Sequence, residues 1–490
     1  MKKDKIDVVL FGFGIIGKKI IPILREKYNI IRWADNDKNK VGLSYEGMTI
    51  CSSKSIVGLK CKIIIATGRE AFVQISNQLL GEGFSEKQLY FVTNSQDLSV
   101  IPYECEELKV DNNITLVEYD QLRNSEDKQC GDRVLILCSF YTPFVIQPIR
   151  NILSRYPEYD ISLLTSSNDY NDSLYDKVKH IYVYKSLLDL ARIINLLPQY
   201  DTVHMLWMEF EWAYFSKMIC AKAGNSIVTI GGSDFYRSSD AMKKYYLKLL
   251  SCVDKINCQT PSVTSDFLKV FPFLGEMIVN VNYGFEALDY IPKPHLRKVS
   301  EIKGSFGFPL DKYIITCGHN ASEAHQHIAI IDALSQLDDS TKSSILCVFP
   351  MTYPNNSDEY INTVENKIRQ TGIDYRILSD YLDVRQIAKY AQISDIMIHV
   401  QTTDMSSATM LEEMYAGAIV VAGSWLPYKW LRENGLFFVS VDEIQDVTQV
   451  IGDIVTRIDV YKEKCINNRQ IVHDFGSWDV CAKKWIEMWR

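Results

Sequence analysis

The sequence lacks several features that define broad classes of protein. No segment approaches the roughly 18 uninterrupted apolar residues of a membrane-spanning helix. The 12 cysteines show no paired spacing of the zinc-binding kind. Lysine and arginine total 53 against 61 acidic residues, a net charge of −8, so the chain has no general electrostatic attraction to nucleic acid. We therefore expect neither a membrane span nor a nucleic-acid partner.

The opening residues, MKKDKIDVVLFGFG, carry an apolar run that is too short for a secretory signal and is soon broken by glycine. Together with the cysteine usage, this predicts a reducing cytoplasm. Peripheral contact with the inner face of a membrane stays open, because AMKKYYLKLL (241–250) interleaves lysines with aromatic residues. The same pattern also fits an ordinary amphipathic helix. No feature of the sequence predicts an oligomeric state.

What the chain does contain is typical of a large α/β protein. Hydrophobic residues make up 47% and charged residues 23% of the chain. Its 490 residues are too many for a single hydrophobic core, so two to four domains are expected. Strand and helix patterns alternate in three successive stretches, which predicts three Rossmann-like, doubly wound blocks. The predicted divisions are a first block (1–98), a linker (99–131), a second block (132–290), a third block (291–465) and a C-terminal helix (466–490).

The first block carries a pattern that is typical of nucleotide-binding modules. A predicted strand runs into Gly12, Gly14 and Gly17, in the order G-x-G-x-x-G, and a predicted helix follows. The next strand ends near Asp35, about where an acidic residue reaches a ribose in such folds. These four residues predict a site for a nucleotide or NAD(P). Alternatively, the glycines only permit a tight turn and close helix packing.

A stretch in the third block, DMSSATMLEEMYAGAIVVAG (404–423), joins a small polar loop to a helix and then to a buried strand. Glu412 is one turn into the helix, so its carboxylate can point back over the helix start. Glu413 is turned by about 100° and should face elsewhere. A structural alternative exists for Glu412, because Thr409 and Glu412 have the spacing of a capping box.

Three motifs occur together in the second and third blocks. Asp404 and Glu412 enclose seven residues, the loop GHNASEAHQH covers 318–327, and GGSDFYR covers 231–237. The first motif resembles that of family-4 GT-B glycosyltransferases, with Asp404 where that family usually has glutamate. The loops 318–327 and 231–237, together with FPMTYPNNSDEY (349–360), are similar to bacterial surface-polysaccharide transferases, among them the type that adds an acetamido-dideoxyhexose to the lipid-linked precursor of enterobacterial common antigen. The resemblance covers about residues 132–490.

The resemblance implies that the third block binds a nucleotide-diphosphate-sugar donor, without a metal ion. The residues that we expect at the donor are Gly318, His319, Asn320, His325, Lys303, Ser406, Ser407 and Glu412. Gly318 would let the backbone approach a phosphate, and a helix beginning near Ser322 would direct its N–H groups there. Structural alternatives are a plain turn at Gly318 and helix-surface positions for His325 and His327.

The resemblance also implies that the second block holds the acceptor. The residues that we expect there are Tyr141, Glu209, Gly232 and Arg237. Asp234 is the expected general base if the reaction inverts, because a carboxylate must then accept the proton of the acceptor hydroxyl. As structural alternatives, Asp234 caps a helix or pairs with Arg237. With Asp404, it makes up the predicted catalytic residues.

The C-terminal segment repeats tryptophan at helical spacing, at Trp478, Trp485 and Trp489, which predicts one buried side. In the GT-B plan such a helix packs back across the cleft. The sequence thus predicts a glycosyltransferase that acts on a polysaccharide, lipid-linked or cell-surface glycan in capsule or lipopolysaccharide assembly. In that case residues 1–98 should be dispensable for transfer. Two other classes stay open: a nucleotide-binding oxidoreductase or sugar-modifying enzyme centred on 1–98, and a non-catalytic GT-B-like scaffold.

Overall fold

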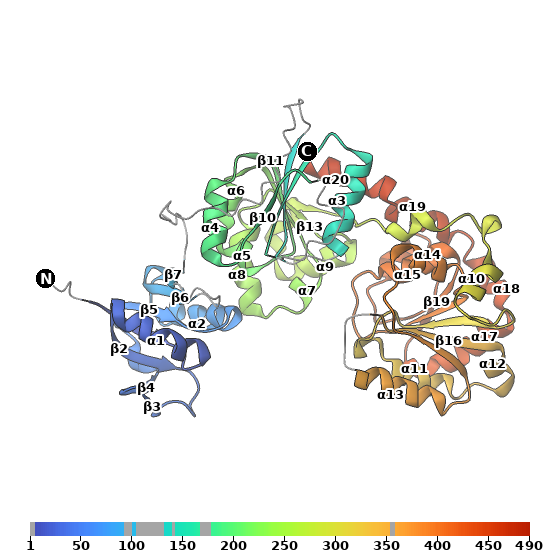
Figure 1. The fold of residues 1–490 in the computed structure, drawn as a ribbon, viewed down its shortest axis with the longest axis horizontal. Helices are drawn as coiled ribbons and strands as arrows, with labels where there is room; N and C mark the ends of the chain where they lie inside the picture. Colours follow the sequence, from blue (N-terminus) through green and yellow to red (C-terminus); the bar gives the residue numbers. More distant parts are fainter. Residues whose placement is uncertain (1–4, 93–99, 104–131, 140–142, 167–177, 353–357) are drawn as a thin grey trace. The chain divides into compact units, whose positions relative to one another are not determined.

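A computed structural model describes residues 5–92, 100–103, 132–139, 143–166, 178–352 and 358–490. Their contacts divide the chain into two units, coloured along the sequence in Figure 1. The first unit is made of residues 1–258, 273–279 and 489–490, and the second of residues 259–272 and 280–488. Tyr141, expected at the acceptor, lies outside the described residues, as does most of the predicted linker.

The first sheet of the first unit has the strand order β3-β4-β2-β1-β5-β6-β7. Its strands are parallel except for the pairs β3/β4 and β6/β7. They are β1 (Ile6–Phe11), β2 (Tyr28–Asp35), β3 (Ser44–Tyr45), β4 (Met48–Ser52), β5 (Lys62–Ile65), β6 (Leu89–Val92) and β7 (Val100–Pro102), with helices α1 (Ile15–Lys27) and α2 (Arg69–Gly81). Strand β7 continues this sheet beyond the predicted block boundary at residue 98.

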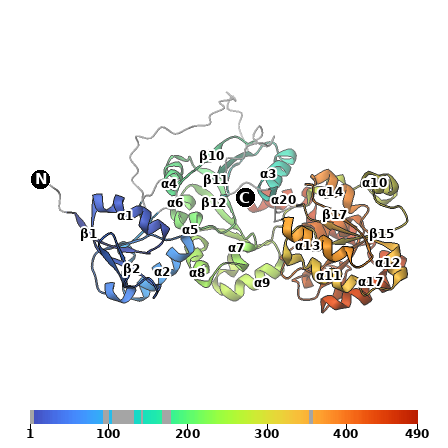
Figure 2. The ribbon, with the colours of Figure 1, turned by 60° about the horizontal axis from the view of Figure 1, so that its bottom comes forward.

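The second sheet is entirely parallel, in the order β10-β9-β8-β11-β12-β13-β14. Its strands are β8 (Arg133–Leu137), β9 (Asp160–Thr165), β10 (Ile181–Val183), β11 (Tyr200–Leu206), β12 (Ala223–Thr229), β13 (Lys255–Asn257) and β14 (Ile278–Val279). The helices are α3 (Pro143–Arg155), α4 (Leu187–Leu196), α5 (Phe210–Tyr214), α6 (Ser216–Cys220), α7 (Ser233–Tyr236) and α8 (Asp240–Leu250). In Figures 1 and 2, α4 and α6 lie on one side of these strands and α3 on the other.

The second unit holds the third sheet, also parallel, in the order β17-β16-β15-β18-β19-β20. Its strands are β15 (Tyr313–Cys317), β16 (Ile345–Pro350), β17 (Asp374–Leu378), β18 (Ile396–His399), β19 (Ile419–Gly423) and β20 (Val439–Val441). The helices are α9 (Pro261–Val270), α10 (Val299–Ser305), α11 (His327–Leu334), α12 (Asp339–Ser344), α13 (Asp358–Arg369), α14 (Val384–Ala391), α15 (Ala408–Ala416), α16 (Lys429–Glu433), α17 (Val447–Thr456), α18 (Ile458–Lys464), α19 (Asn468–Gly476) and α20 (Trp478–Trp489).

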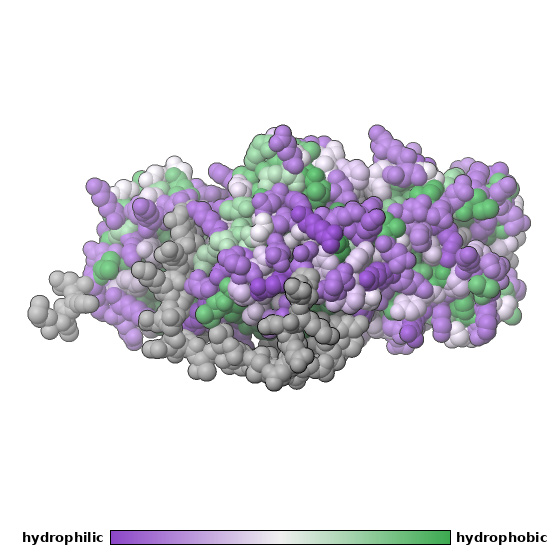
Figure 3. All heavy atoms as spheres, turned by 90° about the horizontal axis from the view of Figure 1, so that it is seen from above, coloured by the Kyte–Doolittle hydropathy of each residue, from purple (hydrophilic) through white to green (hydrophobic). Residues whose placement is uncertain are grey.

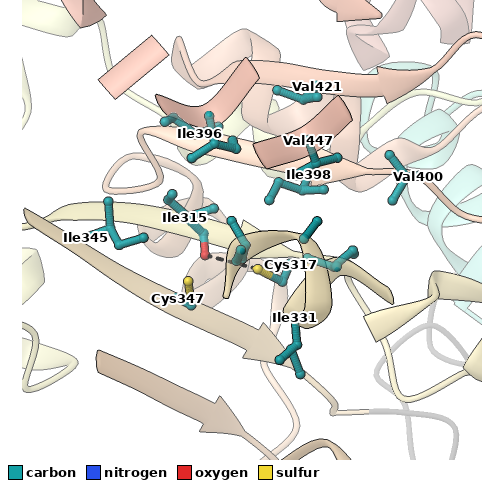
Figure 4. Packing of buried hydrophobic residues seen from close by; sticks show 14 of the residues in the cluster. Ile315, Cys317, Ile331, Ile345, Cys347, Ile396, Ile398, Val400, Val421 and Val447 are labelled. Carbon is teal, nitrogen blue, oxygen red and sulfur yellow. Dashed lines mark hydrogen bonds between the residues drawn. The ribbon is translucent and has the colours of Figure 1, made fainter. Parts of the chain in front are cut away.

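The third sheet divides its side chains between two hydrophobic cores, because successive residues of a strand point to opposite faces. On one face, Ile315, Ile398 and Val421 pack with residues of α11, α13 and α17 (Figure 4). On the other face, Met397 and Val420 pack with residues of α14 and α15. Helices therefore cover both faces, as Figure 1 shows. This explains why the inner strands β16, β18 and β19 are buried along their whole length, whereas the edge strand β17 is not.

Each sheet reverses its strand order at one place: between β1 and β5, between β8 and β11, and between β15 and β18. In open α/β sheets the loops after two such strands diverge, and ligands bind in the crevice between them. The predicted fold class, three doubly wound blocks, is confirmed. The loops that follow these three pairs of strands are therefore the candidate ligand-binding loops.

The three C-terminal tryptophans are buried, as the helical spacing predicts: Trp478 and Trp485 are 0% exposed and Trp489 is 3% exposed. In the second unit, Trp485 Nε1 donates a hydrogen bond to the carbonyl of Asn282 at 3.0 Å. In the first unit, Trp489 Nε1 donates to His204 Nδ1 at 3.0 Å. The stripe is therefore core.

None of the described helices is long and apolar enough to cross a bilayer. On the face shown in Figure 3, hydrophilic residues separate several smaller hydrophobic patches. The segment 241–250, with its interleaved lysines and aromatic residues, lies in α8 and buries Tyr245 and Tyr246 within the first unit. This packing favours the ordinary amphipathic helix over a membrane-contacting one, because the aromatic side is already covered.

An aromatic cluster joins the first block to the second within the first unit. The ring of Phe210, in α5, lies 6.0 Å from that of Phe72 and 5.7 Å from that of Phe91, both in the first block. On its other side Phe210 stacks on Tyr245 at 5.3 Å, with the rings 7° from parallel. Removing residues 1–98 would uncover this apolar surface, so the first block contributes to the packing of the second.

Next to this cluster, Arg69 at the start of α2 forms an ion pair with Glu211 of α5. The Glu211 side chain is 2% exposed, whereas Arg69 is 52% exposed. Burial raises the pKa of Glu211, and the Arg69 guanidinium acts against this rise. The charge of Glu211 therefore depends on a residue from the first block.

We expect Arg69→Met to lower the free energy of unfolding of the first unit by about 1–2 kcal/mol, because it leaves a buried carboxylate without its cation while Arg69 itself is half solvated. Urea unfolding followed by tryptophan fluorescence measures this. The double variant Arg69→Met/Glu211→Gln is the control and should recover most of the loss. An equal loss in the single and double variants would show that the ion pair does not matter.

Candidate functional site

The loop after β15 begins with a turn that only glycine fits. Gly318 has a φ of +68°, which favours glycine over residues that carry a Cβ. A Cβ at this position would lie 2.7 Å from His327 Nε2 and 3.1 Å from His325 Cβ. Gly318 therefore does more than turn the chain: it lets two histidines come close to the backbone at the carboxyl end of β15.

Four histidines gather at this end of the sheet. His319 and His325 follow β15, with ring centroids 4.2 Å apart. His399, the last residue of β18, lies parallel to His319 at 5.7 Å. His327, the first residue of α11, lies 5.7 Å from His325. The surface positions considered for His325 and His327 are wrong, because these residues are 3% and 0% exposed.

Burial keeps three of these rings neutral near pH 7. It lowers the pKa of His325 to about 3 and that of His327 to about 4. The pKa of His319 is also well below its usual range, through burial and through repulsion from the other three rings. A neutral imidazole offers one donor and one acceptor. The cluster is therefore polar and uncharged at these three rings.

Asp404 lies beside the cluster, in the loop after β18. Its Oδ2 accepts a hydrogen bond from the Tyr428 hydroxyl and lies 3.4 Å from His399 Nε2. Tyr428 also bonds His399 Nε2 at 2.7 Å. Burial acts against ionisation of Asp404, but the bonds from His399 and Tyr428 outweigh it and lower its pKa. The first acidic position of the motif is thus a fixed carboxylate at the switch point.

Helix α15 begins directly after this loop, and Ser407 caps it by accepting a hydrogen bond from the Met410 N–H. The cap position excludes the capping box considered for Glu412, because Thr409 is already inside the helix. Glu412 is 9% exposed. Its pKa rises to about 7 because of burial and the nearby Glu286 carboxylate, against the N–H of Ala287.

Glu413 faces elsewhere, as the helical rotation predicts. It is 1% exposed, and its Oε2 accepts a hydrogen bond from Ser394 Oγ at 2.7 Å. Burial raises its pKa to about 8, against hydrogen bonds from Ser394 and Thr316. Glu413 is therefore a buried structural carboxyl at the opposite end of the strands from the histidines, since Ser394 precedes β18.

Lys303 is also at that opposite end, and the structure does not bring it to the histidine loop. Its Nζ donates to the carbonyl of Lys312, which precedes β15. It lines a cavity of about 390 Å³ together with Asp395 and Gly417. Gly318 lies at the far end of the five-residue strand β15. The prediction for Lys303 is wrong because α10 packs beside the amino ends of the strands.

The other predicted donor residues do lie in these loops. Asn320 Oδ1 accepts a hydrogen bond from the Ser322 N–H at 2.8 Å, which shapes the loop after β15. Ser322 caps a short 3₁₀ turn (Glu323–His325), so α11 itself begins only at His327 and not near Ser322. Ser406 is half-buried beside the α15 cap.

In the second sheet, Asp234 ties two loops together. Its Oδ2 accepts hydrogen bonds from the N–H groups of Met208 at 2.7 Å and Gly231 at 3.1 Å. Gly232 caps α7 with a φ of +101°, and Arg237 is exposed at the other end of that helix. Burial raises the pKa of Asp234 to about 6. A structural role for Asp234 is thus present, but through backbone groups of two loops and not through a helix cap.

Glu209 joins the loops after β8 and β11, because its Oε1 accepts a hydrogen bond from the Ser139 N–H at 3.2 Å. Burial raises the pKa of Glu209 to about 8, and repulsion from the Glu211 carboxylate contributes to this rise. Trp207, two residues before Glu209, has a φ of +67°. A Cβ on Gly231 would lie 1.6 Å from Trp207 Nε1. The strained tryptophan therefore fits only against a glycine.

In the first block, the glycines hold the chain in close contact. A Cβ on Gly17 would lie 2.1 Å from the carbonyl oxygen of Gly12, and one on Gly12 would lie 2.8 Å from Thr67 Cγ2. At Gly14, which begins α1, the corresponding space is open. Gly12 and Gly17 thus have the packing role given as the alternative, while the start of α1 keeps room for a ligand.

Asp35 is held by the backbone. Its Oδ2 accepts a hydrogen bond from the Phe13 N–H at 2.6 Å, and its Oδ1 accepts one from the Asp37 N–H at 2.8 Å. Each carboxylate oxygen can accept a second bond. A nucleotide in the first block therefore stays a prediction, with Asp35 already engaged in shaping the loop.

Three residues of these sites were given no role from the sequence: His399, Tyr428 and Glu286. His399 is only five residues before Asp404, but its hydrogen bond to Tyr428 and the proximity of Glu286 to Glu412 arise only in the folded chain. Only His399 could have been found from the sequence: it ends the apolar run IMIH, and polar residues at strand ends are candidates for function.

Comparisons with known proteins give the fold of the larger part of the chain. A family model described as C2185-like, N-terminal, matches residues 4–90. A sequence comparison with curated proteins finds no match. Solved structures with a similar fold include Anabaena HepE in complex with UDP and glucose, with a TM-score of 0.59 and 14% identity, covering 73% of this chain and 99% of that one.

Two further structures are similar over nearly the same share of the chain. A glycosyltransferase from Rickettsia africae has a TM-score of 0.58 and 17% identity, covering 73% of this chain and 97% of that one. Sucrose-phosphate synthase from Thermosynechococcus elongatus has a TM-score of 0.57 and 12% identity, covering 74% and 98%. These likenesses confirm the GT-B fold with two Rossmann-like domains.

The close contact between Gly318 and His327 can be tested by comparing Gly318 with Gly372, which has no such contact. Gly372 has a similar φ of +76° but open space at its Cβ. Gly372→Ala should cost about 1 kcal/mol of stability, from the left-handed backbone alone. Gly318→Ala should cost about 1–3 kcal/mol more, because its Cβ also meets the histidine. Thermal unfolding of both variants measures this, and equal shifts would contradict the close contact.

Proposed function

We propose that this protein is a glycosyltransferase that takes a sugar from a nucleotide-diphosphate donor bound at the third sheet. The observation that carries the proposal is the meeting of the Gly318 loop, Asp404 and the start of α15 at the switch point between β15 and β18. This is where open α/β sheets bind nucleotides. Similar folds have been solved with UDP and with UDP-glucose.

The residue types at this edge suit a diphosphate leaving group. As the sugar leaves, negative charge grows on the phosphates and must be met by hydrogen-bond donors that are already in place. Gly318 admits a phosphate close to the backbone, and the starts of α11 and α15 offer free N–H groups and the positive ends of their dipoles. No metal ion is part of this proposal.

Glu412 is proposed to accept hydrogen bonds from the ribose hydroxyls of the donor. Its pKa of about 7, set by burial and by Glu286, means that this carboxyl group is partly protonated at neutral pH. Two donating hydroxyls would stabilise its ionised form. Asp404, held by Tyr428 and His399, is proposed to act at the transferred sugar.

The acceptor is proposed to bind at the switch point of the second sheet, near Glu209 and Gly232, with Arg237 at its rim. Asp234 is the proposed general base if the reaction inverts, because a pKa of about 6 suits proton transfer near neutral pH. A buried oxygen of Asp234, Oδ1, has no hydrogen-bond partner among the described residues. Tyr141 is also proposed at the acceptor, on the basis of the sequence alone.

A surface glycan is the acceptor class that we propose, either a polysaccharide of capsule or lipopolysaccharide or its lipid-linked precursor. Support comes from the sequence resemblance to such transferases and from the fold of WaaG, a glycosyltransferase involved in lipopolysaccharide biosynthesis (TM-score 0.51, 13% identity, covering 72% of this chain and 99% of that one). A lipid-linked acceptor would bring the protein to the cytoplasmic face of a membrane.

A panel of ligands separates this proposal from the two other classes. Thermal stability is measured with UDP-, GDP-, dTDP- and CMP-sugars and with NAD and NADP. A ligand that binds the folded state raises its melting temperature. Protection by a nucleotide-diphosphate sugar supports transfer, protection by NAD or NADP alone supports an oxidoreductase centred on the first block, and no protection supports a scaffold.

We expect Glu412→Gln to weaken binding of the protecting nucleotide sugar by about 1.5–3 kcal/mol, the range for a hydrogen bond to a charged group. Glu413→Gln is the matched control, because Glu413 faces Ser394 in the core and should leave affinity unchanged. Calorimetric titration of both variants measures the difference. Wild-type affinity in Glu412→Gln would remove the ribose contact from the proposal.

A further inference from the structure

Half of the histidines in the chain stand at one place. Of eight in the sequence, His319, His325, His327 and His399 have ring centroids between 4.2 and 6.5 Å from a neighbour in the group. They come from β18, α11 and the loop after β15, so the fold and not a local repeat brings them together. Packing alone does not require so many ionisable rings in one core.

Three ring nitrogens in this group are buried and have no hydrogen-bond partner among the described residues. They are His319 Nδ1, His327 Nε2 and His399 Nδ1. A buried polar atom without a partner is costly, so three together point to a site that binds a polar ligand. His327 and His399 are each 0% exposed. Their unused nitrogens are thus part of a built site and not of a solvated surface.

Among the described residues, the groups that interact with these rings include no lysine or arginine that could pair with an anion. The charged and titratable groups that face the rings are Asp404 beside His399, Tyr428 and Tyr360 through their hydroxyls, and Glu323 near Tyr360. None of these is a cation. Lys303, the lysine expected there, is at the other end of the strands.

We propose that these four imidazoles bind the diphosphate of the donor, and that they take up protons from solvent as it binds. The inference rests on the proposed function. A neutral imidazole donates one hydrogen bond, whereas a protonated one donates two and carries a positive charge. A diphosphate beside the group of rings supplies the negative charge that makes protonation favourable, and the unpartnered nitrogens are the atoms that receive the protons.

The number of protons is limited by the spacing of the rings. Two positive charges about 4–6 Å apart repel each other strongly in a buried site, so the four rings cannot all be charged at once. We expect about one proton per donor near pH 7, shared within the group. The group behaves as one site, and no single histidine carries the whole effect.

The direction of the pH dependence follows from this uptake. Donor binding raises the pKa of rings that are neutral when the site is empty. Affinity must therefore rise as pH falls, by about tenfold per pH unit for one proton, until the pH drops below the pKa values of the empty site. Above the pKa of the bound state, affinity becomes independent of pH.

The probe is UDP-glucose, or whichever nucleotide-diphosphate sugar protects best in the ligand panel, because its diphosphate diester does not titrate between pH 6 and 8. Titration calorimetry in two buffers of different ionisation enthalpy counts the protons directly. Because Glu412 gives up part of a proton when it accepts the ribose hydroxyls, the count is made in Glu412→Gln as well as in the wild-type protein. In Glu412→Gln we expect about one proton taken up and an affinity that rises from pH 8 to pH 6, and in the wild type a smaller uptake. In Glu412→Gln, binding with no proton uptake and a flat pH profile would overturn the inference while leaving the proposed function intact.

A histidine variant tests whether the protons are taken up by these four rings. His319→Gln keeps hydrogen bonding but cannot be charged, so it should reduce the gain in affinity between pH 8 and pH 6. His473→Gln is the control, since His473 is a partly exposed histidine in α19 of the same unit and lies outside the group. A structural role for His319 would lower affinity equally at both pH values. His325→Gln replaces it if His319→Gln does not fold.

Two further outcomes bear on the source of the effect. Uridine, which lacks phosphates, should bind without proton uptake, and an equal uptake with uridine would overturn the inference. Among the described residues, no three His, Cys, Asp or Glu side chains converge as metal ligands do. Failure of every nucleotide-diphosphate sugar to bind would instead remove the proposed function, and this inference with it.

Discussion

The reversal of strand order between β15 and β18 is the constraint on which the candidate site depends. Because the chain leaves β15 toward β16 and returns on the other side at β18, the loops after these two strands diverge and face each other across the sheet edge. Gly318 and His399 meet there although the chain between them forms two further strands. A shift of either strand in register would separate the histidines from Asp404.

The sheet cores keep this edge in place. The third sheet is covered on both faces, so its strands have little freedom to slide, and the loops begin from fixed points. Ser407 then fixes the start of α15 beside the β18 loop. The site thus depends on ordinary packing and capping, and its functional groups are attached to rigid elements.

Features that are set by residues close together in the sequence could be predicted, whereas features that depend on residues far apart in the sequence could not. The doubly wound blocks, the tryptophan stripe and the different directions of Glu412 and Glu413 follow from local periodicity, and the structure confirms them. Lys303 was placed wrongly because α10 alone does not reveal which sheet edge it covers. His399 and Tyr428 were missed because their hydrogen bond joins loops that only strand pairing brings together.

The same limit applies to the first block. A glycine pattern and an acidic residue predicted a nucleotide site, yet the structure gives Gly17 a packing role and engages Asp35 with the Phe13 N–H. The sequence also suggested that residues 1–98 are dispensable for transfer. The aromatic packing of Phe210 and the pairing of Glu211 with Arg69 argue against independence, because both are completed only by the first block.

The contact between Trp207 and Gly231 has a consequence for how this protein varies among its relatives. Trp207 adopts a left-handed backbone conformation, and its indole occupies the space where any Cβ on Gly231 would stand. A substitution of Gly231 is therefore tolerated only after the tryptophan has been replaced by a smaller residue. In an alignment of relatives the two positions should change together, with small residues at 207 wherever 231 is no longer glycine.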